Sequence, residues 1–139
     1  MLKLWPRRAQ PPEPPSARHG QLGEQAAKEH LCRKGWKCLR ANFRSARGEI
    51  DLVCWDGDCL VFVEVKTRSS EQWRRPAAYV DARKRKALSR CALDYLRLIK
   101  NPRVKIRFDV VEVLLRDCAV AEVRHLPNTF SLSAPYRYG

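Results

Sequence analysis

Two carboxylates and a lysine, Asp51, Glu64 and Lys66, are the residues of this chain whose chemistry is easiest to interpret. Magnesium is usually held in proteins by one or two carboxylates together with water and substrate phosphate. A metal bound by Asp51 and Glu64 would polarise a phosphoryl oxygen and acidify a water molecule. Lys66, two positions after Glu64 and so on the same face of a strand, would orient that water or balance developing negative charge. These residue types are compatible with phosphodiester hydrolysis that depends on Mg²⁺ or Mn²⁺.

The same three side chains could instead form a ladder of ion pairs on adjacent strands. Many sheets contain such cross-strand pairs, and each contributes modest stability. Spacing alone does not distinguish the ladder from the metal site, so the surrounding elements must be considered.

A hairpin is expected to position these residues. Asp56-Gly57-Asp58 separates two strand-like runs, Ile50–Trp55 and Cys59–Val63. Asp-Gly between such runs is a strong signal for a hairpin turn. Asp51 and Glu64 are therefore expected on neighbouring antiparallel strands.

Alternation of side chains along the first strand predicts that Ile50 and Leu52 share one face and that Glu49 and Asp51 share the other. The second strand contains the continuous apolar run Leu60–Val63, which suits a strand covered on both faces and central to its sheet. A carboxylate beside such a run needs a cation, a metal or hydrogen-bond donors, because an unpaired buried charge is costly.

The remaining periodicity predicts an α/β fold with a mixed sheet flanked by helices. Residues 20–139 are expected to form a single domain, after a disordered tail over residues 1–19 that is rich in proline and arginine. The further elements are expected at Gly20–Gly35 (helix), Trp36–Phe43 (strand), Ala77–Ile99 (helix), Val104–Leu115 (strand) and Ala119–Leu126 (edge strand).

The chain is strongly basic, with 28 Lys and Arg against 15 Asp and Glu and a net charge of +13. This balance favours a polyanionic partner, with nucleic acid the first candidate and an acidic membrane surface the second. No apolar run is long enough to cross a bilayer, and no apolar stretch after Arg7-Arg8 suits a signal-peptide core, so a signal peptide is not expected. A cytoplasmic location is expected.

Six cysteines are present, and none of their spacings is C-x-x-C. They are expected to be free cytosolic thiols. Cys54 and Cys59 flank the hairpin turn and could face each other across the strands. A zinc site at His30, Cys32 and Cys38 is disfavoured because no fourth ligand stands at a familiar spacing.

Several side chains near the acids are candidates for contact with nucleic acid. Arginines beside carboxylates could bind phosphate or could neutralise the carboxylates. The polar loop Arg68–Pro76 suits contact with a sugar-phosphate backbone and base stacking. Glu24 could belong to the site, or could be a surface residue favoured near a helix N-terminus. The candidates for nucleic-acid binding are Arg44, Arg47, Arg68, Trp73, Arg74, Arg75 and Lys84.

A set of motifs in a fixed order carries a family resemblance. They are Gly23-Glu24, Asn42-Phe43-Arg44, Arg47-Gly48-Glu49-Ile50-Asp51-Leu52, Phe62-Val63-Glu64-Val65-Lys66-Thr67-Arg68, Val80-Asp81 with Lys84, and Arg107-Phe108-Asp109-Val110. Together they resemble the YraN-like uncharacterised bacterial family. The string D-x12-E-x-K also resembles the signature of the PD-(D/E)xK nuclease superfamily, and the family is similar to archaeal Holliday junction resolvases.

This resemblance implies a restriction-endonuclease-like core and an endonuclease that acts on DNA, including branched DNA. It implies that Asp51, Glu64 and Lys66 are the catalytic trio and that Glu24 is the acid that resolvase-like members place on their first helix. Glu49 belongs to the family's own motif and could support the other acids or pair with Arg47. DNA is expected rather than RNA, and a homodimer is possible because two cuts need two sites. The alternative is a nucleic-acid-binding module that keeps the fold without turnover.

Overall fold

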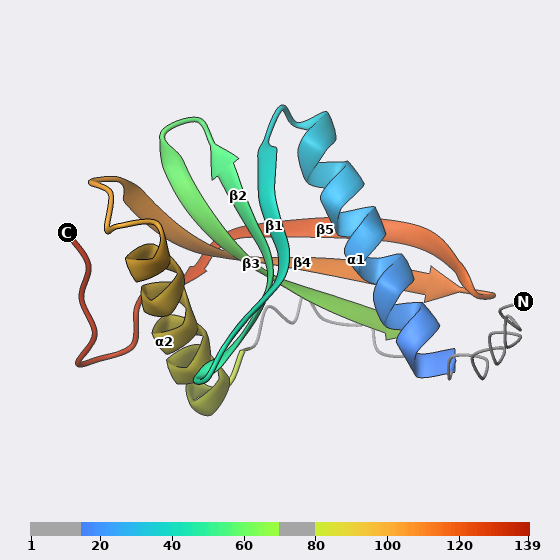
Figure 1. Cartoon of the computed structure of the whole chain (residues 1–139). Coiled ribbons are helices and arrows are strands. Elements are labelled where there is room, and N and C mark those ends of the chain that lie inside the picture. The colour runs from blue at the N-terminus through green and yellow to red at the C-terminus, as the bar shows by residue number, and fades with distance from the viewer. Residues whose placement is uncertain (1–14, 70–79) are drawn as a thin grey trace, which may run out of the picture.

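A computed structural model describes residues 15–69 and 80–139 of the chain (Figure 1). The order of its elements is helix, three strands, helix and two strands, as predicted. The elements are α1 (Pro15–Arg33), β1 (Lys37–Ser45), β2 (Gly48–Asp56), β3 (Cys59–Ser69), α2 (Ala82–Leu98), β4 (Lys105–Arg116) and β5 (Ala119–Phe130).

The five strands form one mixed sheet in the order β1-β2-β3-β4-β5. β3 and β4 are parallel, and the other neighbouring pairs are antiparallel. The parallel pair needs a crossover, and α2 lies within it. The predicted central position of β3 and the predicted edge position of β5 are both confirmed.

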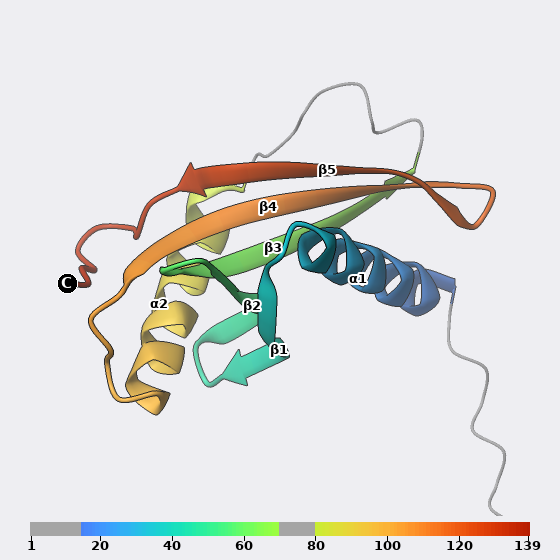
Figure 2. The same ribbon diagram turned by 90° about the horizontal axis from the view of Figure 1, so that it is seen from above.

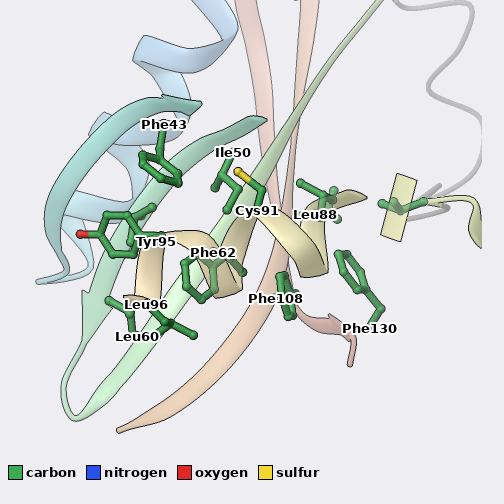
Figure 3. Close-up of a cluster of buried hydrophobic side chains, with 14 residues drawn as sticks. Phe43, Ile50, Leu60, Phe62, Leu88, Cys91, Tyr95, Leu96, Phe108 and Phe130 are labelled. Atoms are coloured by element: carbon green, nitrogen blue, oxygen red, sulfur yellow. The ribbon is translucent and has the colours of Figure 1, made fainter. Parts of the chain in front are cut away.

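One helix packs on each face of the sheet. Phe62 of β3 belongs to a cluster that includes Leu88 and Tyr95 of α2 (Figure 3). Its neighbour Val61 belongs to a second cluster, with Leu31 of α1. Consecutive residues of a strand point to opposite faces, so α1 and α2 cover opposite sides. Figure 2 shows the two helices on either side of the arm formed by β1 and β2.

Helix α1 begins earlier than the sequence pattern predicted. It starts at Pro15 rather than Gly20, so residues 15–19 are helical and do not continue the expected tail. Residues 1–14 of that tail lie outside the described part. Proline is tolerated at a helix start because its missing N–H has no partner there. The helix is followed by Gly35, whose φ of 87° suits glycine.

Helix α2 begins later than predicted. The expected start at Ala77 lies outside the described residues, and Val80 and Asp81 are not helical. Asp81 is the N-cap, with its carboxylate accepting a hydrogen bond from the Lys84 N–H at 2.8 Å. Aspartate is among the residues that best satisfy a free N–H at a helix start, so the helix begins at Ala82.

The predicted contact between Cys54 and Cys59 is wrong. Cys54 lies opposite Val61 across the hairpin, while Cys59 pairs with Asp56. On its other side Cys54 lies opposite Cys38 of β1. The two-residue turn sets this register and keeps the two cysteines apart. All six cysteines are free thiols.

Within the described part of the chain, neither helix is both long and apolar enough to span a membrane.

Candidate active site

The site is built where β2 leaves β3. The paired part of the two strands ends at Leu52 and Val63. One residue beyond this pair, the Asp51 carboxylate accepts a hydrogen bond from the Val65 N–H at 2.8 Å. A side chain thus takes the place of a backbone partner, and Asp51 is held in the gap between the two strands.

The alternation of β2 breaks at this point. Ile50 packs in the cluster under α2, whereas Leu52 packs in the cluster under α1. The prediction that Ile50 and Leu52 share a face is therefore wrong. The reason is local, because strict alternation requires a regular pleat and the ladder to β3 has ended at Leu52.

Three acids influence one another in this gap. Burial raises the pKa of Asp51 to about 7, and the negative charges of Glu64 and Glu24 add to this effect. The Val65 N–H and the positive charge of Lys84 act in the opposite direction. Asp51 of β2 is therefore affected first by its burial and by Glu64 of β3, and less by Glu24 of α1.

Glu24 reaches the site because α1 approaches β3 closely. A Cβ atom at Gly23 would lie 1.9 Å from Oγ1 of Thr67, so only glycine permits this separation. Glu24 is the tenth residue of α1 and no acid stands in the first turn. The alternative explanation of Glu24 as a residue favoured by the N-terminal dipole is therefore wrong, since that effect is confined to the first turn.

Lys84, predicted as a nucleic-acid contact, lies against the acids. Its ammonium is 3.1 Å from Oε1 of Glu64, a side chain that is only 11% exposed. Burial lowers the pKa of Lys84, but the carboxylate of Glu64 outweighs this and the net change is upward. Lys84 thus supplies an internal positive charge to the site.

Lys66 differs from Lys84 in its surroundings. Its pKa is lowered by burial and by the positive charge of Arg68, while Glu64 and Glu112 partly oppose the change. A lysine with a lowered pKa releases its proton more readily than an exposed one. Lys66 is therefore suited both to balance charge and to take part in proton transfer.

Glu49 is on the margin of the site. It pairs with Arg44 of β1 at 3.4 Å, and both side chains are exposed. The two residues lie directly opposite each other in the β1–β2 ladder. The suggested partner of Glu49, Arg47, is engaged elsewhere.

Arg47 connects the β1–β2 turn to α2. Its guanidinium donates to both carboxylate oxygens of Asp94, at 2.7 and 3.1 Å, and to the Arg90 carbonyl at 3.3 Å. Next to it, a Cβ at Gly48 would lie 3.0 Å from the Ala87 carbonyl oxygen, so the turn touches the helix backbone (Figure 1). Arg47 neutralises a carboxylate, as one alternative proposed, but on α2 rather than in the hairpin.

Sequence reasoning missed a buried charge beside Lys66. Glu112 of β4 is fully buried and lies opposite Lys66 in the parallel ladder. Its carboxylate oxygens are 4.0 Å from Arg68 and 3.4 Å from Arg124. A single acid within the apolar run VVEVLL was the available signal. Arg68 was predicted in a loop, but it lies in β3, which continues to Ser69. Trp73, Arg74 and Arg75, the loop's other candidates, lie outside the described residues.

A second buried acid, Asp109, stabilises the opposite face. Burial would raise its pKa, but hydrogen bonds from His125, Arg107 and the Asn128 N–H lower it below its usual value. His125 and Arg107 approach it at 2.7 and 2.8 Å. With three donors and no gap around it, Asp109 is explained by structural pairing.

The donor set suits a hard divalent cation. Asp51 and Glu64 offer oxygen ligands only, which Mg²⁺ and Mn²⁺ prefer. A cation between them would remove the repulsion that raises the pKa of Asp51. Among residues 15–69 and 80–139, no group of three or more His, Cys, Asp or Glu side chains is placed so that it could hold a metal ion.

Comparison with known proteins identifies the family. The profile of the uncharacterised protein family UPF0102 matches residues 23–113. A UPF0102 protein of Trichlorobacter lovleyi is 41% identical over 115 residues, which cover 82% of this chain and 91% of the relative. Another, from Symbiobacterium thermophilum, is 46% identical over 98 residues, covering 70% and 83%. The chain belongs to the UPF0102 family. The predicted YraN-like resemblance is thereby confirmed.

The UPF0102 match covers the site as a whole. It begins at Gly23, the close contact between α1 and β3, and extends past Glu112. Cys118 and the whole of β5 lie beyond it. The part of the chain that characterises UPF0102 is therefore the part that carries the acids and their supporting elements.

Proposed function

We propose that this UPF0102 protein is a metal-dependent endonuclease of the PD-(D/E)xK type, built on a restriction-endonuclease-like core. The observation that carries the proposal is the buried Asp51 carboxylate held in the gap between β2 and β3, with the negative charges of Glu64 and, more weakly, Glu24 acting on it. Burial and mutual repulsion raise the pKa of Asp51 to about 7. Acids are rarely gathered at such a cost without a cation to bind.

The roles follow from the surroundings of each residue. Asp51 and Glu64 would hold Mg²⁺ or Mn²⁺, which when bound supplies an activated water and polarises the phosphoryl group. The Val65 N–H fixes the orientation of the Asp51 carboxylate at 2.8 Å. Lys66 balances negative charge on the phosphate and, with its lowered pKa, exchanges a proton with water. Glu24 adds negative charge that favours cation binding.

DNA is the proposed substrate. The net charge of +13 favours a polyanion. Arg44, with 74% of its side chain exposed, is available to a phosphate at the margin of the site. The resemblance to Holliday junction resolvases extends the proposal to branched DNA and to a homodimer, because two strands must be cut.

A nucleic-acid-binding module without turnover is the second candidate. The observation that favours it is the ion pair between Lys84 and Glu64 at 3.1 Å, which neutralises one metal ligand from within the chain. If Lys84 kept this position permanently, the acids would form a structural cluster and the basic surface would act alone.

A cleavage panel separates the two functions. The full chain is incubated with labelled linear, single-stranded and four-way-junction DNA, and with RNA of the same shapes, in Mg²⁺ or Mn²⁺. We expect DNA cleavage that requires the metal and falls by at least about 100-fold in Glu64→Gln. Binding measured in chelator should persist in this variant.

The matched control is Glu29→Gln, an exposed position on α1 that pairs only within its own helix in the described residues. This variant should cut like the parent. Cleavage by Asp51→Asn or Glu64→Gln at the parental rate would contradict the metal site. Binding without cleavage under either metal would establish the second candidate instead.

A further inference from the structure

Three cysteine sulfurs lie in a row at the end of α1, away from the acids. Sγ of Cys32 is 3.6 Å from Sγ of Cys38, and Sγ of Cys54 is 3.4 Å from Sγ of Cys38. They come from α1, β1 and β2, respectively. The proposed function gives these thiols no role, and the chain has three other cysteines, Cys59, Cys91 and Cys118.

The three thiols form a gradient of exposure. Cys32 is exposed, Cys38 is partly buried and Cys54 is fully buried. Lys28 lies one helical turn before Cys32, and its positive charge reaches Cys38. A small oxidant therefore meets Cys32 first, in a basic environment, with a second thiol already beside it.

We propose that Cys32 and Cys38 are a peroxide-sensitive dithiol that closes to an intramolecular disulfide. The Cys32 thiolate attacks hydrogen peroxide, breaking the O–O bond to give a sulfenic acid and a hydroxide, which takes up the proton released when the thiol ionised and becomes one water. The Cys38 sulfur then attacks Sγ of Cys32, forming the S–S bond and expelling the hydroxyl as a second water. Two thiols lose two electrons and two protons, and one peroxide becomes two waters.

The geometry requires only a small movement. A disulfide has an S–S length of about 2.05 Å, so the two sulfurs must approach by roughly 1.5 Å. Cys32 lies in the last turn of α1, one residue before its end, where the helix can adjust. Five residues separate the two cysteines.

Cys54 is not the partner in this assignment. It is fully buried on β2, between β1 and β3, and burial raises the pKa of its thiol. Its thiol donates to Sγ of Cys38 and so holds that sulfur in place. Burial also raises the pKa of Cys38, which suits the slower resolving step rather than the first attack.

Trypsin provides a direct readout because it separates the three cysteines. Cleavage after lysine and arginine leaves Cys32 in Glu29–Arg33, Cys38 in Cys38–Arg40 and Cys54 in Gly48–Lys66. The full chain, carrying Cys118→Ser to remove an exposed thiol that could link two molecules, is treated with hydrogen peroxide, alkylated with N-ethylmaleimide and digested. Mass spectrometry should show Glu29–Arg33 joined to Cys38–Arg40.

The same sample should lose two alkylated thiols per chain, and dithiothreitol should restore both. Adding Cys32→Ser should abolish this loss, while adding Cys59→Ser, at a thiol outside the row, should leave the linked peptide in place. Circular dichroism before and after oxidation checks that the fold is kept. A link between Cys38–Arg40 and Gly48–Lys66, links only between chains, or unchanged alkylation at a twofold excess of peroxide would each overturn the assignment.

Discussion

At the scale of single residues, Asp51 makes the stability of this protein depend on pH. Burial and the charge of Glu64 raise the pKa of Asp51 from 3.8 to about 7. Between these values the folded chain keeps a proton that the unfolded chain has released. The stabilisation that the protonated Asp51 carboxyl gives to the folded chain is fully present below about pH 4 and is lost as pH rises to about 7.

The Asp51→Asn variant tests this dependence. Asparagine cannot ionise and can still accept the Val65 N–H, so the contribution of residue 51 should no longer vary with pH. At pH 8 we expect the variant to be more stable than the parent by at most roughly 4 kcal/mol, since the pKa shift is about three units and each unit corresponds to about 1.4 kcal/mol. Urea unfolding of both proteins from pH 4 to pH 8 measures the difference.

The matched substitution is Asp117→Asn, at an exposed residue in the turn between β4 and β5 whose φ of 52° asparagine tolerates. It should not change the pH profile. Parallel profiles for Asp51→Asn and the parent would contradict the raised pKa. Addition of Mn²⁺ at pH 8 should stabilise the parent but not Asp51→Asn, because a bound cation relieves the same repulsion.

At the scale of secondary-structure elements, the position of α1 on β3 determines whether Glu24 reaches the site. Gly23 permits this contact, because any Cβ there meets Thr67 at 1.9 Å. Three residues earlier on the same helix, a Cβ at Gly20 would meet nothing within 4 Å. A comparison of alanine substitutions at the two glycines therefore distinguishes the effect of packing from the effect of helix propensity.

We expect opposite results from Gly23→Ala and Gly20→Ala. Alanine is a better helix former than glycine, so Gly20→Ala should stabilise the chain by about 0.5–1 kcal/mol. Gly23→Ala should destabilise it by about 1–3 kcal/mol, because α1 must move away from Thr67. Thermal unfolding measures both changes.

DNA cleavage by the Gly23→Ala variant should fall, because Glu24 is displaced with α1. A Gly23→Ala chain as stable and as active as the parent would show that this contact does not position Glu24.

Other elements are held in place by similar local contacts. Arg47 and Gly48 hold the β1–β2 turn on α2, and Asp81 fixes the start of that helix beside Lys84. The gap between β2 and β3 is therefore supported from both faces of the sheet.

At the scale of the whole molecule, the excess of positive charge predicts salt-dependent binding. Each phosphate that is neutralised releases counterions, so affinity falls steeply as salt rises. If about six phosphates are contacted, the affinity for DNA should drop by on the order of 10³-fold between 50 and 200 mM salt. Fluorescence anisotropy with a labelled duplex in chelator measures this slope.

The Arg44→Ala variant should reduce the slope by about one, as expected for the loss of one phosphate contact. The comparison variant is Lys105→Ala. Lys105 of β4 forms an exposed ion pair with Asp58, which lies in the turn between β2 and β3. Affinity that is independent of salt, or equal slopes for the parent and Arg44→Ala, would contradict the assigned role of the basic surface.

Much of this molecule was predictable from sequence because the decisive patterns are local. The Asp-Gly turn, the apolar run of β3 and the periodicity of α2 each depend on neighbours a few positions away. They were enough for the order of elements and the central strand, whereas membership of the family followed from the resemblance of the ordered motifs. The start of α2 was missed because the Asp81 cap competes with a helical pattern that continues upstream.

The sequence by itself determined which residues could bind a cation, and tertiary structure decided which of them meet. The hairpin signal predicts that Asp51 and Glu64 lie on neighbouring strands. Packing between distant segments decides the rest, namely the break in β2 at Asp51, the approach of Glu24 and the positive charge supplied by Lys84. The buried Glu112 and the three sulfurs were likewise visible only after folding. Periodicity reports which way a side chain faces, whereas contacts between α1, α2 and the sheet decide what it faces.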